Sequence, residues 1–290
     1  MNNDPGMRAL RRGAVCLAAV LFTSACSTDP PSLLQSINAY RTTTQTCNGK
    51  RFEALGPLAP SAALAKVDLG LAKQSLNDAL ARVGYSASAA QAVVLSGPST
   101  LTGSAMKVLK DRYCEVLLSG QFSEIGISRD GMTWRLVFAQ PLLARDLGDW
   151  REAGLQVLRL VNEARGHART CGTQQFQPAA PVEWNATLAS AALHHSTDMA
   201  KRNYFAHKAP DGRVVDDRAA AAGYDWQHIA ENIAAGQGSP AQAVAGWLAS
   251  PNHCVNVMGP EFTEMGAAYA INQRSDTRIY WAQVLGGPRR

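Results

Sequence analysis

The chain has 290 residues, 46% of them hydrophobic, which is enough to bury the cores of two domains of ordinary size. Its formal net charge is +5, but setting aside residues 1–25 leaves 25 basic and 22 acidic residues. No run of Lys and Arg and no interleaving of basic with aromatic residues accompanies this small excess. These features argue against a protein that binds nucleic acid.

Residues 1–25 have the order of features of a secretory signal peptide. A basic stretch with Arg8, Arg11 and Arg12 precedes an apolar run of nine residues, from Ala14 to Phe22. Because a helix needs roughly 20 apolar residues to cross a membrane, this run is too short to be a span. A buried core helix is the alternative, but it would not begin with clustered arginines at the start of the chain. We therefore expect export.

Cys26 is the candidate lipidation site, because the small residues Ser24 and Ala25 directly precede it, as in bacterial lipoprotein signals. Residues 26–35 are then expected to form a short lipidated tether. Thr23 departs from the pattern, which usually has a Leu-like residue there, and ordinary cleavage nearby would give a freely soluble protein. The serine after Cys26 predicts the periplasmic side of the outer membrane in a bacterium with two membranes. Otherwise the lipoprotein is expected at the cell surface.

Four cysteines remain once Cys16, inside the apolar run, and Cys26 are set aside. They are Cys47, Cys114, Cys171 and Cys254. In an oxidising compartment four cysteines allow three pairings, among which spacing alone does not choose.

An internal repeat indicates which pairing to expect. The segment from Ile37 to Leu64 matches the segment from Val161 to Leu188 at a constant offset of 124 residues, with Cys47 opposite Cys171. Tyr113-Cys114 likewise matches His253-Cys254, and Phe122–Gly126 matches Phe262–Gly266. The repeat therefore predicts one bridge in each copy, Cys47–Cys114 and Cys171–Cys254, each stabilising by roughly 4 kcal/mol on the chain-entropy model. A mixed pairing, such as Cys47 with Cys171, would instead mean that the halves are interleaved.

Helices precede strands in the second copy. Apolar residues at helical spacing predict helices over 154–166 and from Asn185 to Asn203. Ser239 is expected to cap a third helix, with Pro240 in its first turn and Pro251 as its stop. Met265–Ile271 and Ile279–Leu285 are short, mostly apolar and bounded by turn-forming residues, as strands are. Helices packed on an antiparallel sheet would bury both sets of apolar faces, so the predicted fold class is an α+β sandwich.

Six motifs in this half, taken in order, resemble a bacterial CAP domain, from the family of cysteine-rich secretory, antigen 5 and pathogenesis-related proteins. They are His195-Ser-Thr-Asp-Met199, Tyr204-Phe-Ala-His207, Ala230-Glu-Asn-Ile233, Trp247 with Asn252-His253, Phe262-Thr-Glu-Met-Gly266 and Tyr280-Trp-Ala-Gln-Val284. The resemblance covers roughly residues 154–287. It implies an α-β-α sandwich with a cleft that holds two histidines and two acidic residues. Residues 36–145, which contain no histidine, are then expected to be a degenerate CAP-like domain without a site.

The resemblance places His207, His253 and Glu231 in the cleft. Many eukaryotic relatives carry the second acid on the helix just after the tryptophan, where this chain has Ser250, so Glu264 is expected to take its place. Yet the first copy, which has no histidine, keeps Glu124 at the position of Glu264. Glu264 is therefore expected to serve the fold at least as much as a metal.

Two imidazoles with one or two carboxylates suit zinc or another divalent metal. The alternative is that these side chains only tie loops together by hydrogen bonds. His195 shares a helix face with apolar residues and is expected to be packed and bonded to a neighbouring loop, with His194 facing solvent. Catalytic residues stay unassigned, because no G-x-S-x-G or H-E-x-x-H motif is present.

Three functions fit these features. The preferred one is a cell-envelope binding module, held to the membrane by its lipid, whose cleft recognises a lipid, a glycan or a protein and not a nucleic acid. The first alternative is a metal-dependent hydrolase, since peptidase-like activity has been proposed for some members of the resembled family. The second is a structural or interaction protein that uses the first copy as its working surface.

Overall fold

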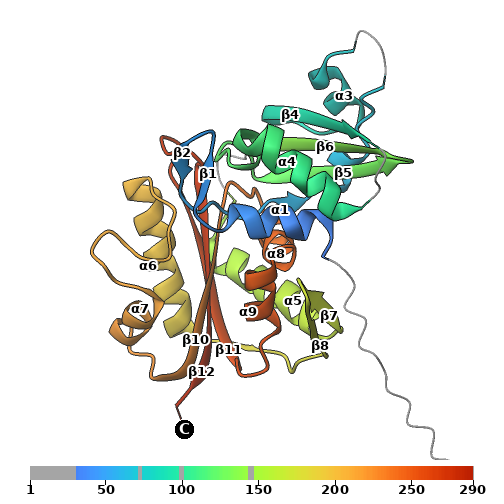
Figure 1. The fold of residues 1–290 in the computed structure, drawn as a ribbon. Helices are drawn as coiled ribbons and strands as arrows, with labels where there is room; N and C mark the ends of the chain where they lie inside the picture. Colours follow the sequence, from blue (N-terminus) through green and yellow to red (C-terminus); the bar gives the residue numbers. More distant parts are fainter. Residues whose placement is uncertain (1–30, 71–73, 98–100, 143–146, 290) are drawn as a thin grey trace, which may run out of the picture.

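A computed structural model describes residues 31–70, 74–97, 101–142 and 147–289. The predicted signal peptide and Cys26 lie outside the described residues. The described chain forms two halves, each an α-β-α sandwich of one sheet between two layers of helices (Figure 1). The predicted α+β class and α-β-α architecture are confirmed for the C-terminal half.

The N-terminal half is built on a sheet with strand order β3-β5-β6-β4. Its elements are α1 (Leu33–Arg41), β1 (Gln45–Cys47), β2 (Lys50–Phe52), β3 (Ala59–Pro60), α2 (Ala62–Ala65), α3 (Leu76–Arg82), β4 (Ala87–Ser96), α4 (Thr102–Leu117), β5 (Glu124–Asp130) and β6 (Thr133–Pro141). Helices α1 and α4 bury Ile37 and Leu109 against one face of this sheet. Helices α2 and α3 bury Leu64 and Leu80 against the other.

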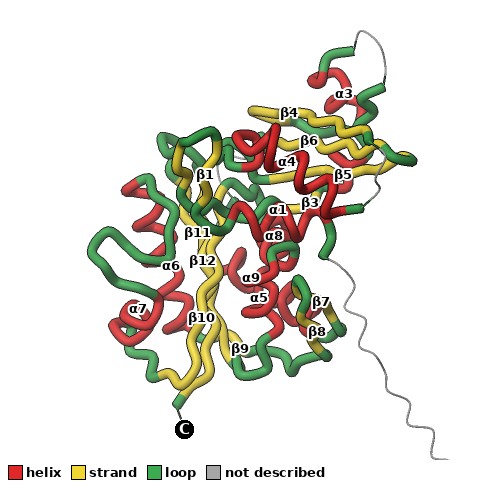
Figure 2. Tube along the Cα trace, viewed as in Figure 1, coloured by secondary structure: helices red, strands yellow, loops and turns green. Residues whose placement is uncertain are grey.

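The C-terminal half has a sheet with strand order β10-β12-β11-β9. Its elements are α5 (Trp150–Arg165), β7 (Arg169–Cys171), β8 (Gln174–Phe176), β9 (Glu183–Trp184), α6 (Ala186–Arg202), α7 (Val215–Ala221), β10 (Trp226–Ala235), α8 (Pro240–Leu248), α9 (Pro251–Met258), β11 (Glu264–Ile271) and β12 (Ile279–Pro288). Helices α5, α8 and α9 cover one face, and α6 and α7 cover the other (Figure 2). The sheet is antiparallel except for the short strand β9, which pairs parallel to β11.

Local chemistry explains where the predicted elements begin. Asn185 caps α6 by accepting from the amides of Thr187 and Leu188. Ser239 caps α8 and Pro240 occupies its first position, as predicted. Helix α8 ends before Pro251, as predicted. Pro251 is also the first residue of the next helix, α9, which carries His253.

The two halves use the same buried polar contacts at matching positions. Arg41 is buried and donates to the carbonyls of Leu117 and Phe122, whereas Arg165 is buried and donates to those of Val257 and Phe262. A buried guanidinium must have its donors satisfied, and here backbone carbonyls satisfy them in both halves.

Each half also contains one disulfide. Cys47 is bonded to Cys114 and Cys171 to Cys254, with Cα–Cα distances of 5.8 and 5.5 Å. The predicted pairing is therefore confirmed, and the bridges do not interleave the halves.

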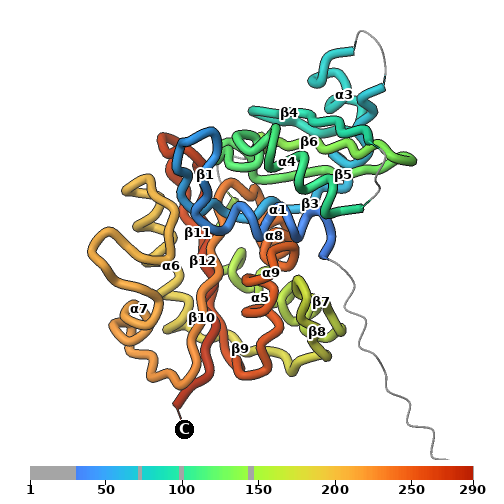
Figure 3. The backbone as a smooth tube through the Cα atoms, in the orientation of Figure 1, coloured from blue at the N-terminus to red at the C-terminus, as the bar shows by residue number. Residues whose placement is uncertain are grey.

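Buried hydrogen bonds join the halves where β10 ends. Ser123 and Gln140 both donate to the carbonyl of Gly236, and Gln237 donates to the carbonyl of Pro57. Helix α1 lies beside α9, so the blue and orange segments of Figure 3 are neighbours in space. Among the described residues, no helix is both long enough and apolar enough to cross a membrane.

Candidate functional site

The candidate site lies at β10, the edge strand of the C-terminal sheet. Glu231 and Asn232 are neighbours on this strand, so their side chains point to opposite faces of the sheet. Glu231 reaches the loop that follows α6, and Asn232 reaches α9. Each face of the edge strand therefore positions one histidine.

His207 is held on the α6 side by three contacts. Its Nδ1 lies 2.8 Å from Glu231 Oε1, and its carbonyl accepts from Arg218 Nη2 at 3.0 Å. His195 Nε2 donates to the carbonyl of the preceding residue, Ala206, at 3.0 Å. Because a carboxylate accepts, the proton of the neutral His207 ring sits on Nδ1, which leaves the lone pair of Nε2 free. The side chain is 53% exposed, so a ligand can reach that nitrogen.

Glu231 is the buried centre of this arrangement. Its second oxygen, Oε2, accepts from Arg218 Nη2 at 2.7 Å, and its side chain is only 2% exposed. Burial by itself would raise the pKa of Glu231, but the hydrogen bond from His207 and the charges of His195 and Arg218 outweigh it and lower the pKa. The carboxylate is therefore ionised and fully engaged, and it orients His207 much as second-shell carboxylates orient metal-binding histidines.

His253 comes from the other face. Its ring Nδ1 shares a hydrogen bond of 2.8 Å with Ser250 Oγ at the start of α9, and Asn232 donates to its backbone carbonyl at 3.2 Å. Burial, followed by the charge of His207, lowers the pKa of His253 to about 3, so its ring is neutral at ordinary pH. The rings of His207 and His253 lie 6.4 Å apart between centroids.

Two other histidines, His194 and His195, are neighbours on α6. His195 is fully buried and bonded to the loop at Ala206, as predicted, and burial lowers its pKa. His194 is exposed, also as predicted.

Glu264 does not lie with the histidines. Its carboxylate accepts from the Tyr224 hydroxyl at 2.6 Å, and within the described chain no hydrogen bond or ion pair joins it to His207, Glu231 or His253. Glu264 lies on β11, and strand β12 stands between β11 and β10. Glu264 is therefore separated from β10 by roughly 10 Å across the sheet. The N-terminal half repeats the contact, since Tyr85 donates to Glu124. The structure therefore does not bring Glu264 together with the two histidines and Glu231, and the contact that it shows for Glu264 is the hydrogen bond from Tyr224.

A hollow of about 240 Å³ opens beside the two histidines. Leu55, Phe205 and Ile233 give it apolar walls, and Glu53 lies at its edge. Leu55 and Glu53 belong to the N-terminal half, whose Gly56 packs against the Phe205 ring. The cleft is thus shared by both halves, a feature that motifs confined to residues 154–287 did not predict.

The donor set fits a metal only in part. The described residues include no group of three His, Cys, Asp or Glu side chains that could hold an ion. The ring nitrogens available to a metal are Nε2 of His207 and Nε2 of His253, because the Nδ1 atom of each ring is hydrogen-bonded. Both oxygens of Glu231 are already bonded, one to His207 and one to Arg218. Structural zinc sites have four protein ligands and catalytic sites usually three, so a metal here would need ligands from the bound molecule or water.

Comparison with known proteins agrees with this geometry. Residues 158–285 match the family model described as CAP, the cysteine-rich secretory protein family. Over these residues the chain is similar to the CAP family. The site residues His207, Glu231 and His253 and the cysteines of the second disulfide all fall within the matched residues.

Two Bacillus subtilis proteins are each 34% identical to part of this chain. YkwD matches over 118 residues, which are 41% of this chain and 44% of YkwD, and the membrane protein YlbC matches over 87 residues, which are 30% and 25%. This chain thus spans less than half of either relative. Among solved structures, an extracellular SCP-domain protein of Bacillus anthracis is 22% identical with a TM-score of 0.41, covering 53% of this chain and 52% of that one.

Proposed function

We propose that this protein is an exported, lipid-anchored binding module of the cell envelope, whose cleft between the two halves holds a small amphiphilic ligand. The observation that carries the proposal is the cleft itself: two fixed imidazoles face a hollow with apolar walls. Small-molecule sites are typically apolar clefts with a few convergent polar groups. Export and the lipid anchor are supported by the order of features in residues 1–26.

Leu55, Phe205 and Ile233 would contact the apolar part of the ligand, and His207 Nε2 would meet its polar end. The buried network behind His207 fixes the ring before a ligand arrives, so little entropy is lost on binding. Zinc held by both histidines would polarise a carbonyl or phosphoryl oxygen of the ligand.

Hydrolysis has less support than binding. A general base must be free to take a proton, yet one oxygen of Glu231 is bonded to His207 and the other to the buried Arg218. Its lowered pKa makes it a weaker base still. We therefore place Glu231 as a positioning residue and keep the metal-dependent hydrolase as the second candidate.

We also propose that the N-terminal half is a degenerate CAP-like copy that serves as a wall of the cleft. The identical strand order, the matching disulfide and the matching contacts of Arg41 and Arg165 support this. Tyr113 stands where the second half has His253, and no histidine occurs before His167. As an interaction surface in its own right, this half is the third candidate function.

The first experiment is a calorimetric titration of residues 27–290 with zinc, followed by titration with a fluorescent fatty acid. We expect His207→Ala and His253→Ala to weaken binding of the fatty acid at least fivefold. His194→Ala, an exposed histidine outside the cleft, is the matched control and should bind normally. Zinc binding that both variants abolish would add a metal to the site. Failure of the wild type to bind either probe would overturn the proposal.

A further inference from the structure

The histidine cleft, which is the hollow that His207 and His253 share with the N-terminal half, carries little positive charge. Among the described residues that line it, none is Lys or Arg. His253 is neutral at ordinary pH, because burial lowers its pKa to about 3. The guanidinium of Arg218 behind His207 is compensated by Glu231. A negatively charged end group of a ligand therefore finds no charged partner in this lining.

His207 offers a hydrogen-bond acceptor to the cleft. Its Nδ1 donates to Glu231 Oε1 at 2.8 Å, so Nε2 carries the lone pair, and the side chain is 53% exposed. A carboxylate bonded to one side of an imidazole also makes the far nitrogen more basic. The group of a ligand that meets Nε2 must therefore donate a proton.

Two residues of the N-terminal half add acceptors to the same lining. Thr42 Oγ1 donates its proton to the carbonyl of Asn38 at 2.9 Å, so its oxygen is left to accept. Glu53 contributes a carboxylate, whose ion pair with Arg51 is 72% exposed on both sides and is therefore weak. His207, Thr42 and Glu53 together supply three acceptors, one of them charged.

We propose that the histidine cleft binds amphiphiles whose polar end is a primary ammonium. An ammonium has three donors and no acceptor, which matches the three acceptors of the lining, whereas a carboxylate has acceptors alone. The alkyl part of the ligand contacts Leu55, Phe205 and Ile233. The inference rests on the proposed function, to which it adds the charge of the ligand.

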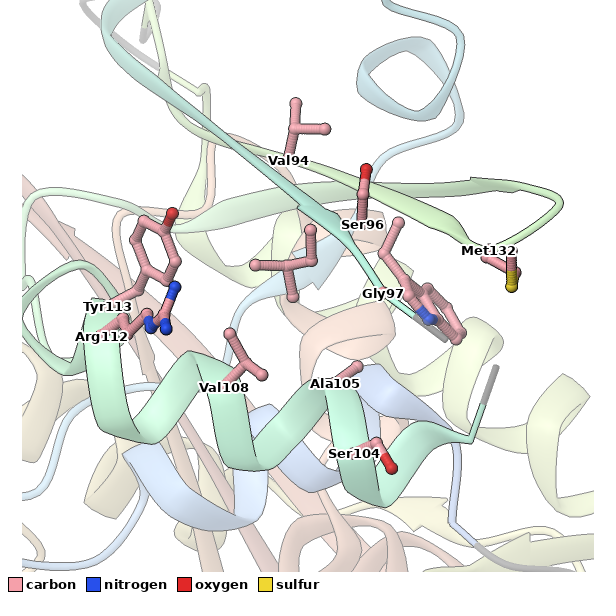
Figure 4. Close-up of a pocket in the computed structure, with 11 residues that line it drawn as sticks. Val94, Ser96, Gly97, Ser104, Ala105, Val108, Arg112, Tyr113 and Met132 are labelled. Atoms are coloured by element: carbon pink, nitrogen blue, oxygen red, sulfur yellow. The ribbon is translucent and has the colours of Figure 1, made fainter. Parts of the chain in front are cut away.

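The N-terminal half has a hollow of its own, about 190 Å³ in volume, which carries a cation instead. Figure 4 shows Arg112 and Tyr113 together at one end of it. Tyr113 stands at the sequence position that His253 has in the second half. Any binding of an acid that Arg112→Gln abolishes is therefore assigned to this hollow and not to the histidine cleft.

The test compares octylamine, 1-octanol and octanoate, which share one alkyl chain and differ at the polar end. Each is titrated by calorimetry into residues 27–290 at pH 8, where imidazole is ordinarily neutral. EDTA is present, because zinc would compete with the ammonium for the lone pair of His207. We expect octylamine to bind at least about tenfold more tightly than octanoate, with 1-octanol between them.

The outcomes separate this inference from the proposed function. Octanoate or 1-octanol bound in the cleft as tightly as octylamine would overturn the inference and leave the proposed function standing. If none of the three compounds binds, both fail.

Variants of the N-terminal half test the acceptors without disturbing the buried network of Glu231. Glu53→Gln keeps the size of the side chain and should weaken octylamine binding about threefold while leaving 1-octanol unchanged. Thr42→Val removes one acceptor at nearly constant shape and should also weaken octylamine binding. Glu163→Gln, at an exposed glutamate outside the cleft, is the matched control and should bind normally. An affinity for octylamine that neither Glu53→Gln nor Thr42→Val changes would overturn the inference.

Discussion

Glu231 is the residue on which the histidine cleft depends, because it compensates Arg218 and orients His207 from a nearly inaccessible position. Removing one partner of a buried ion pair leaves the other charge unpaired. Arg218 itself has one further nitrogen, Nε, that is buried without a partner among the described residues. Its charge is therefore especially reliant on this carboxylate.

We expect Glu231→Gln to lower the free energy of unfolding by about 3–5 kcal/mol, the usual cost of leaving a buried charge uncompensated. Urea unfolding of residues 27–290 measures it. Asp211→Asn, which breaks the exposed pair with Arg213, is the matched control and should change little. Adding Arg218→Met to Glu231→Gln should recover part of the loss. A cost for Glu231→Gln no larger than that of the control would contradict this account.

His253 should make stability depend on pH. Its pKa is about 3 in the folded chain and about 6.5 when unfolded, so between these values the unfolded chain binds the extra proton. Stability therefore falls as the pH falls through this window, by about 2 kcal/mol from pH 7.5 to 5 for one such group. His253→Gln should remove that share of the pH dependence, measured by urea unfolding at several pH values. An unchanged pH profile would show that His253 is already accessible to protons in the folded state.

Sequence reasoning found the residues of this site that lie in family motifs and missed those that do not. His207, Glu231 and His253 come together as expected, but Arg218 lies on the short helix α7 beside Asp216 and Asp217. Such a charged run looks solvent-exposed, and nothing in the sequence marks one of its members as buried. The hydrogen bond between Tyr224 and Glu264 was accessible from the sequence, because both halves have a Gly-Tyr pair and a glutamate at matching positions.

Among the elements, close packing of α6 on the sheet depends on one glycine. A Cβ on Gly266 of β11 would overlap the backbone of Leu188 and Ala189, which begin α6. The same relation holds in the other half between Gly126 of β5 and the backbone of Leu64 in α2. Helix and strand touch here without any side chain between them.

Gly266→Ala should therefore destabilise the chain by about 3 kcal/mol or more, since overpacking forces the backbone to move. Gly103→Ala is the matched control, because a Cβ there meets no atom and the residue lies within α4. It should stabilise by about 0.5–1 kcal/mol through its higher helix propensity. Thermal unfolding followed by circular dichroism distinguishes the two, and equal midpoints would refute the packing argument.

Helix caps, apolar spacing and strand composition predicted five of the eleven described elements of the C-terminal half, which are α5, α6, α8, β11 and β12. Two of the elements that escaped show why. Strand β10 does not alternate polar with apolar residues, because Glu231 and Asn232 are both buried by polar partners on opposite faces. Helix α9 was hidden because Pro251 suits both the end of one helix and the first position of the next. Only tertiary packing decides whether Pro251 follows the end of one helix or begins another.

At the scale of the whole molecule, the two halves are joined by polar contacts that exclude water. Gln237 is fully buried and donates to the carbonyls of Pro57 and Ser123, and Gly236 accepts from two side chains of the other half. Gln242 of α8 also contacts Glu124 across the boundary. Burial raises the pKa of Glu124, against the hydrogen bonds from Tyr85 and Ser61, which lower it.

We expect the halves to unfold together in a single calorimetric transition, because neither half can separate without exposing these groups. Gln237→Ala should lower stability by about 1–3 kcal/mol, because the buried carbonyl of Pro57 loses its donor, whereas that of Ser123 keeps the amide of Ala59. It should also broaden or split the transition. Two resolved transitions in the wild type would show instead that the halves are energetically independent.

The disulfide pattern has a consequence for how the chain acquires its covalent structure. Cys47 and Cys114 both precede Cys171, so the bonded pairs follow one another along the chain. A polypeptide that enters an oxidising compartment amino end first presents Cys47 and Cys114 before Cys171 and Cys254 arrive. With Cys26 carrying the proposed lipid, joining these four thiols in order of appearance would give the native pairing. Oxidation during translocation therefore needs no later exchange of partners.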